Sequence, residues 1–137
     1  MIPFIPEKIV KKYLGIPYKN RGRGMDGLDC WGLIVNVYKD YGVEVFDLEN
    51  YDAEWQRHGG NLIMDNYYEN WQKVTCYGPG DVVLMRYPRD VVGHAGIFLD
   101  RGMFIHATRE GVVVSRVKDW LPKIFAFYRW TNIKTKT

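Results

Sequence analysis

A change in the spacing of apolar residues constrains the fold of this chain most. From residue 30 to residue 41 apolar side chains recur at Cys30 and then at positions +3, +4, +7, +8 and +11, which is the spacing of one helix face. From Asp81 onward the pattern changes to short β-branched or aromatic runs between Gly, Asp and Pro: DVVLMR, HAGIFLD, MFIHAT, VVVSRV and IFAFYRW. Helices followed by a meander of about five strands predict an α+β domain, with helices packed on one face of an antiparallel sheet.

The size and composition of the chain predict one folded domain over residues 1–137. A hydrophobic content of 47% and an aromatic content of 15% are typical of a globular core. The net charge of +3 is too small and too scattered to predict a nucleic-acid surface. No apolar run approaches the roughly 18 residues of a membrane span, and we expect no signal peptide because the N-terminus lacks an apolar segment before a cleavage site.

Three further features mark the helices. Pro6 predicts the start of a short helix that ends near Leu14, and Gly42 predicts the end of the helix that begins at Cys30. Residues 44–75 are polar and aromatic, and we expect a helix over 61–71 within them. Five aromatic residues of this insert suit an interface with a partner, with inward packing as the alternative: Tyr51, Trp55, Tyr67, Tyr68 and Trp71.

Cys30 lies where a glycine-rich loop turns into the second helix. Asp29 is a favourable N-cap, so Cys30 would occupy the first helical turn. There the helix dipole lowers the pKa of a thiol, while the charge of Asp29 opposes this effect. The alternative is a buried core thiol, because Cys30 is also in phase with the apolar stripe.

Two histidines lie on neighbouring predicted strands and could serve this cysteine. A nucleophilic cysteine needs a base, and the base needs a group that orients it; His94 and His106 suit these two roles. Cys30, Cys76, His94 and His106 could instead supply four zinc ligands. No pair of them has the local spacing of a zinc site, so we expect no metal and no other cofactor.

The turn between the two histidine-bearing strands decides whether the imidazoles meet. A two-residue turn would place His94 and His106 on opposite faces of the sheet. A three-residue turn over 100–102 would pair His106 with Gly96 and place both imidazoles on one face. Gly102 suits the second choice, because the third residue of such a turn takes a positive φ. We therefore predict the three-residue turn and a contact between His94 and His106.

Three segments carry a family resemblance: GIPYKNRGRGMDGLDCWGLIVNVY, PGDVVLMR and GHAGIFLDRGMFIHA. In this order they resemble the NlpC-type papain-like cysteine peptidases, α+β enzymes that cut bacterial cell-wall stem peptides, usually between D-γ-glutamate and a diamino acid. The resemblance implies a papain-like fold with Cys30 as the nucleophile, His94 as the general base and His106 as the residue that orients it. It also implies that Tyr18 and Asp29 line the substrate site.

Two departures indicate the phage-tail branch of this family. Trp31 stands where cell-wall members usually have a serine, and the insert replaces their usual Arg-(Thr/Ser)-Ser stretch. We assign Trp31 to the substrate site with Tyr18 and Asp29. The resemblance implies a protein of the virion tail tip that acts in the host envelope, with peptidoglycan stem peptides and tail-tip proteins as partners. A structural subunit with a vestigial site, and an acyltransferase or thioesterase, remain alternatives.

Overall fold

The computed structural model describes residues 3–45, 71–87, 89–90 and 92–131. Within them the helices are α1, α2 and α4, and a 3-10 turn, η2, follows α4; their bounds are Pro6–Tyr13, Cys30–Asp40, Val117–Trp120 and Leu121–Lys123. The strands β1 to β8 are, in chain order, Arg23–Gly24, Gly27–Leu28, Trp71–Val74, Val82–Arg86, Val92–Phe98, Met103–Thr108, Gly111–Arg116 and Ile124–Trp130.

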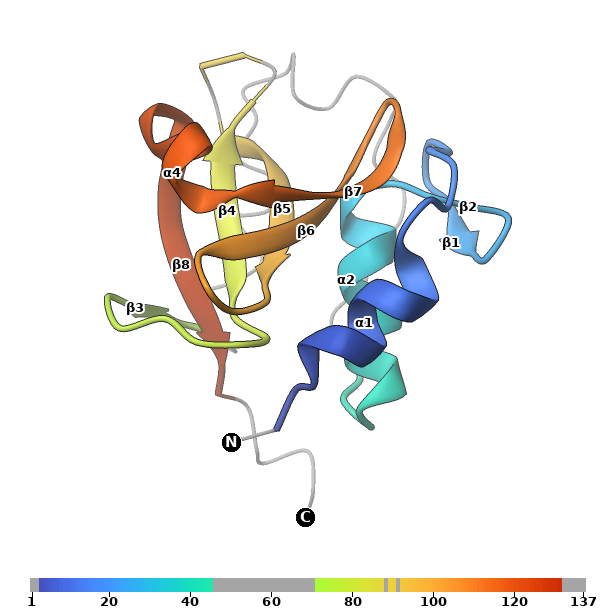
Figure 1. Cartoon of the computed structure of the whole chain (residues 1–137), viewed down its shortest axis with the longest axis horizontal. Helices are drawn as coiled ribbons and strands as arrows, with labels where there is room; N and C mark the ends of the chain where they lie inside the picture. The colour runs from blue at the N-terminus through green and yellow to red at the C-terminus, as the bar shows by residue number, and fades with distance from the viewer. Residues whose placement is uncertain (1–2, 46–70, 88, 91, 132–137) are drawn as a thin grey trace.

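Six of these strands form one antiparallel sheet in the order β3-β8-β4-β5-β6-β7, and β1 pairs with β2 in a separate hairpin. The predicted meander accounts for β4 to β8. It differs from the structure in one respect, because β8 returns across the sheet to pair with both β3 and β4. Figure 1 shows α1 and α2 together on one side of the strands and α4 on the other.

Helix α2 forms where the apolar spacing predicts it. Asp29 caps its first turn, and its Oδ1 accepts a 2.7 Å hydrogen bond from the Gly32 amide. The chain leaves the helix through Gly42, which has a φ of +78°. Most of the helix is buried against β5 and β6. The predicted first helix is also present, with Pro6 in its first turn.

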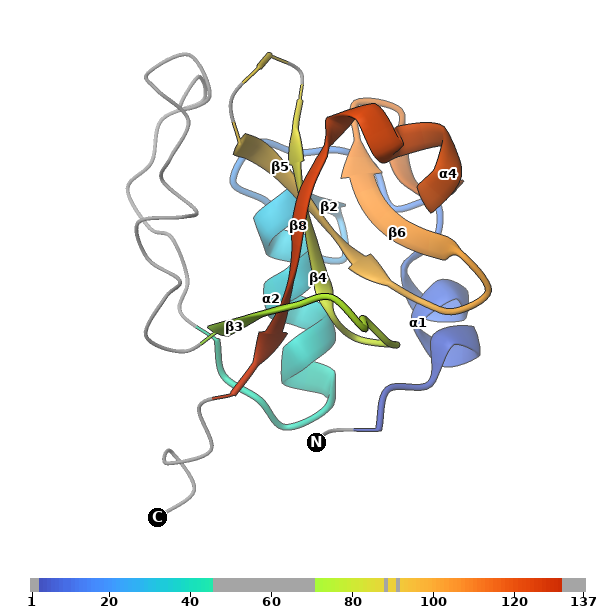
Figure 2. The same ribbon diagram turned by 90° about the vertical axis from the view of Figure 1, so that its left-hand side faces the viewer.

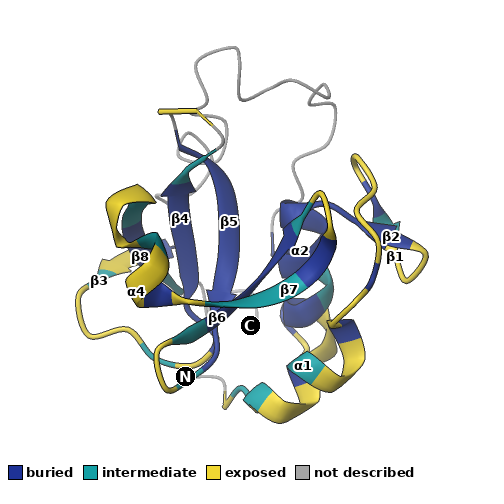
Figure 3. Ribbon diagram, turned by 45° about the horizontal axis from the view of Figure 1, so that its top comes forward, coloured by how far each residue is buried: buried dark blue, intermediate teal, exposed yellow. Residues whose placement is uncertain are grey.

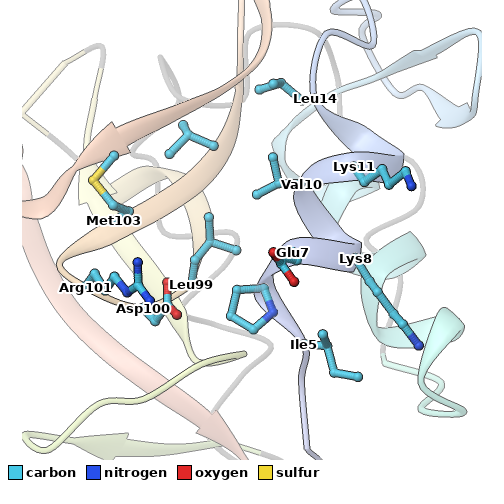
Figure 4. A pocket seen from close by; sticks show the side chains of 12 residues that line it. Ile5, Glu7, Lys8, Val10, Lys11, Leu14, Leu99, Asp100, Arg101 and Met103 are labelled. Atoms are coloured by element: carbon cyan, nitrogen blue, oxygen red, sulfur yellow. The ribbon is translucent and has the colours of Figure 1, made fainter.

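The sheet separates two apolar clusters. Side chains from α1 and α2 pack with one face of the strands, including Leu84, Ala95 and Ile105. The other face carries a smaller cluster around Phe104 and Met85, against which Trp120 of α4 packs. The predicted packing of the N-terminal helices on the antiparallel sheet is therefore confirmed, whereas α4, which the sequence analysis did not predict, covers the other face. Because both faces are covered, β4 and β5 are buried along almost their whole length (Figure 3).

The insert over residues 44–75 is described only at its ends. The predicted helix over 61–71 lies outside the described residues except for Trp71, which begins β3 instead of ending a helix. Trp71 is buried because its indole packs against Trp130 on β8 and Tyr38 on α2, with ring centroids 5.1 and 5.6 Å apart. Figure 2 shows β3 next to the lower part of β8, with which it pairs.

Candidate active site

Cys30 is the first residue of α2, and its surroundings are set by the carboxylate of Asp29. Asp29 Oδ1 accepts from Gly32 and from Arg23 Nη1 at 2.9 Å, and its Oδ2 accepts from the Arg21 amide at 3.0 Å. These bonds clamp the preceding loop onto the helix start. Asp29 is only 4% exposed, so the geometry gives it a structural role as cap and clamp. The substrate contact expected for Asp29 stays a prediction.

The pKa of the Cys30 thiol is raised to about 12, and the lowered pKa expected at a helix start is therefore wrong. Burial is the main cause, followed by the charge of Asp29. The Ala95 amide, which faces the sulfur, and the positive charge of Arg23 oppose the rise but do not outweigh it. The thiol is therefore neutral in the resting protein.

His94 lies just after an irregularity in β5. In the pairing with β4, Met85 is opposite His94 but Arg86 is opposite Val92, so one extra residue is accommodated before the histidine. Such bulges redirect the side chains that follow them. The next residue is Ala95, whose amide faces the thiol of Cys30. The strand thus brings the candidate base next to the residue that contacts the candidate nucleophile.

The two histidines meet as the predicted turn requires. His106 pairs with Gly96, and Leu99 N donates to Met103 O, so the three-residue turn is confirmed. His94 Nε2 and His106 Nδ1 are 2.8 Å apart, which confirms the predicted contact. Gly102 has the predicted positive φ of 73°.

The turn differs from the expected geometry at one residue. Arg101 also adopts a positive φ, of 51°, which a non-glycine residue rarely does. The turn therefore has two consecutive left-handed residues where the prediction required one.

Burial keeps both imidazoles neutral near pH 7. It lowers the pKa of His94 to about 3, with a further contribution from His106, and it lowers the pKa of His106 to about 4. Three aromatic residues pack against the pair, and the ring centroid of Phe104 is 4.5 Å from that of His106. Trp120 lies edge-on to His106 with ring centroids 5.0 Å apart, and Tyr87 lies 5.3 Å from His94.

Ser115 on β7 is a site residue that the sequence analysis missed. Its Oγ lies 2.9 Å from His106 Nε2, so the hydrogen bonds continue from His94 through His106 to the next strand. The signal available in the sequence was the register of β6 and β7. With Phe104 opposite Ser115, the serine and His106 must share a face of the sheet.

The other two predicted site residues differ in accessibility. Tyr18 is 37% exposed. Its pKa is raised to about 12 by burial and then by Cys30 and Asp29, while Arg109 opposes the rise, so the phenol lies in the electrostatic neighbourhood of the thiol. Trp31 is only 3% exposed and belongs to the core between helices and sheet. Contact of either residue with substrate stays a prediction.

Neither a metal cluster nor a membrane helix is found in the part of the chain that the structure describes. No group of three or more His, Cys, Asp or Glu side chains there could hold a metal ion. Cys76, one of the four possible zinc ligands, is exposed. No helix among the same residues is long and apolar enough to cross a membrane.

Comparison with known proteins agrees with this arrangement of cysteine, histidines, helix and sheet. The model of the NlpC/P60 family matches residues 15–129. The chain belongs to this family. An NlpC/P60 family protein of Bacillus cereus has the same papain-like α+β fold, with a TM-score of 0.68 and 20% identity; the match covers 94% of this chain and 41% of that one.

Two relatives of this NlpC/P60 chain differ in what their names say. The tail tip assembly protein K of Escherichia phage lambda is 31% identical over 105 residues, which cover 74% of this chain and 52% of the phage protein. The gamma-DL-glutamyl hydrolase of Bacillus subtilis is 28% identical over 137 residues, covering 96% of this chain and 30% of the hydrolase. The match thus spans about half the length of the first relative and less of the second.

Proposed function

We propose that this chain is a cysteine peptidase domain of a phage tail tip. Its substrate would be a peptidoglycan stem peptide, and the bond cut would join D-γ-glutamate to the diamino acid. The observation that carries the proposal is the 2.8 Å contact between His94 Nε2 and His106 Nδ1, on a strand whose next amide faces the thiol of Cys30. A base that is held by a second polar residue, and that directly precedes an amide facing a thiol at a helix start, suits acyl transfer.

The ring nitrogens of His94 have different roles in this mechanism. Nε2 is occupied by His106, so Nδ1 is the nitrogen that takes the thiol proton. Because burial keeps thiol and imidazole neutral, the proton moves as Cys30 Sγ attacks the amide carbonyl. The reaction thus uses general-base catalysis rather than a thiolate that forms before substrate binds.

The remaining steps use the same groups. The backbone amide of Cys30, at the positive end of the α2 dipole, stabilises the oxyanion of the tetrahedral intermediate. His94 then returns the proton to the leaving amine, the C–N bond breaks, and the acyl group stays on Cys30 as a thioester. Water, deprotonated by His94, hydrolyses the thioester and restores the thiol.

Digestion of defined stem peptides tests this proposal. The chain would be incubated with L-Ala-D-γ-Glu-diaminopimelate peptides, and the products identified by mass spectrometry. We expect cleavage after D-glutamate, its complete loss in Cys30→Ala, and normal cleavage in Cys76→Ala, which removes the exposed cysteine instead. Intact peptides with the wild-type chain would refute the proposal.

The phage relative's name favours a second candidate, a structural subunit of the tail tip. In that case Cys30→Ala would leave tail assembly and infectivity unchanged, and the wild-type chain would cut no peptide. An acyltransferase or thioesterase on the same fold would be recognised by transfer of the acyl group to an added amine, or by preference for thioester substrates.

A further inference from the structure

The completely buried imidazole of His106 has a partner at each ring nitrogen. His94 Nε2 lies 2.8 Å from Nδ1, and Ser115 Oγ lies 2.9 Å from Nε2. A neutral imidazole donates from one nitrogen and accepts at the other. The two contacts are therefore coupled, because the role of Ser115 sets the role that His106 presents to His94.

Only one arrangement of hydrogens leaves His94 able to act as a base toward Cys30. Nδ1 of His94 must be free of hydrogen, so its Nε2–H donates to His106 Nδ1. The hydrogen of His106 is then on Nε2 and is donated to Ser115 Oγ. In the opposite arrangement His106 donates to His94, and the hydrogen on His94 moves to Nδ1, where it blocks proton transfer from the thiol.

We propose that Ser115 is a positioning residue that holds His106, and through it His94, in the productive tautomer. This inference rests on the proposed peptidase function. Ser115 is the only serine of the chain, and it follows three consecutive valines on β7. In this tautomer its hydroxyl accepts the hydrogen bond from His106 Nε2, and the His106 ring has no exposed surface from which to reach water.

Two features of the fold fix the hydrogen bonds that join His94, His106 and Ser115: the register of β6 with β7, and the packing of α4. The register of β6 and β7 places Ser115 opposite Phe104, so its side chain is diagonal to His106 on the same face. Five residues later Trp120 packs edge-on against the His106 ring. Ser115 is half-buried, but the His106 ring behind it has no exposed surface, so loss of the serine leaves Nε2 of His106 without this protein partner.

Substitution of Ser115, with three readouts, tests the inference. We expect Ser115→Ala to lower kcat by up to about tenfold with little change in KM, and Ser115→Thr, which keeps the hydroxyl, to restore most of it. In histidine ¹⁵N–¹H NMR spectra of the resting protein, the Nε2–H tautomer of both histidines should dominate in the wild type and lose population in Ser115→Ala. Val114→Ala alters the same strand on the opposite face and should change neither readout.

The outcomes separate this inference from the peptidase proposal. If the wild type cuts stem peptides but Ser115→Ala keeps its kcat and tautomers, the positioning role is refuted. A Ser115→Thr variant as impaired as Ser115→Ala would refute it equally. If no variant cuts any peptide while the tautomers shift as expected, the positioning role stands and the peptidase proposal fails.

Discussion

Gly96 controls how closely the two histidines approach, and its replacement by alanine provides a quantitative test. A Cβ at this position would lie 2.7 Å from the backbone oxygen of Ile105 and 3.0 Å from the Cβ of His106. The first contact is with backbone of the paired strand, which cannot rotate away, so β5 and β6 must separate. Overpacking of this kind costs about 1–3 kcal/mol.

The same displacement acts directly on the proposed catalytic pair. The contact between His94 Nε2 and His106 Nδ1 is 2.8 Å, and a further separation of about 0.7 Å would take it beyond hydrogen-bond distance. We therefore expect Gly96→Ala to lower the free energy of unfolding by about 2 kcal/mol and peptide cleavage by at least tenfold, as His94 loses its orientation.

Urea denaturation and the stem-peptide assay measure the two effects. Gly78→Ala is the matched control, because nothing lies within 4 Å of its added Cβ and its φ is not positive; it should match the wild type in both assays. The reasoning would be refuted if Gly96→Ala unfolded at the same urea concentration as Gly78→Ala and cleaved peptides at the same rate.

Two further predictions concern charges near the site and within the fold. The pKa of Cys30 is raised to about 12, so its alkylation by iodoacetamide in a Cys76→Ala background should be slow at pH 8, and the rate should increase about tenfold per pH unit toward that value. Asp29→Asn removes a charge that raises the pKa and should therefore speed the reaction. A rate that has already reached its plateau at pH 8 would contradict both expectations. Asp81 is buried, and it accepts two hydrogen bonds from the partly exposed Arg129 at 3.0 and 2.7 Å. Asp81→Ala should therefore lower the unfolding free energy by about 1–2 kcal/mol, whereas an unchanged urea midpoint would show that this pair contributes nothing to stability.

Local patterns were sufficient for α2 and for the histidine hairpin. The helical spacing and the Asp29 cap are read from residues a few positions apart, and they predict where Cys30 lies on the helix. The register of β5 and β6 follows from a three-residue turn, so the meeting of His94 and His106 was predictable as well. In these elements the relevant forces act between neighbours in the sequence.

Features that depend on distant parts of the chain emerged only in the tertiary structure. The pairing of β3 with β8, which buries Trp71 against Trp130, joins segments more than fifty residues apart, and no local pattern specifies such a partner. The position of α4 on the opposite face of the sheet follows from the same long-range packing.

The electrostatic state of the site also depends on the complete fold. The helix dipole favours a Cys30 thiolate, but burial by α2 and β5 raises the thiol pKa because it removes the water that would stabilise the charge. In the sequence Ser115 is a single polar residue after three valines, and only the pairing of β7 with β6 shows that it shares a face of the sheet with His106. The sequence alone therefore predicts which residues would carry the chemistry, whereas their protonation and their further partners follow from what packs around them.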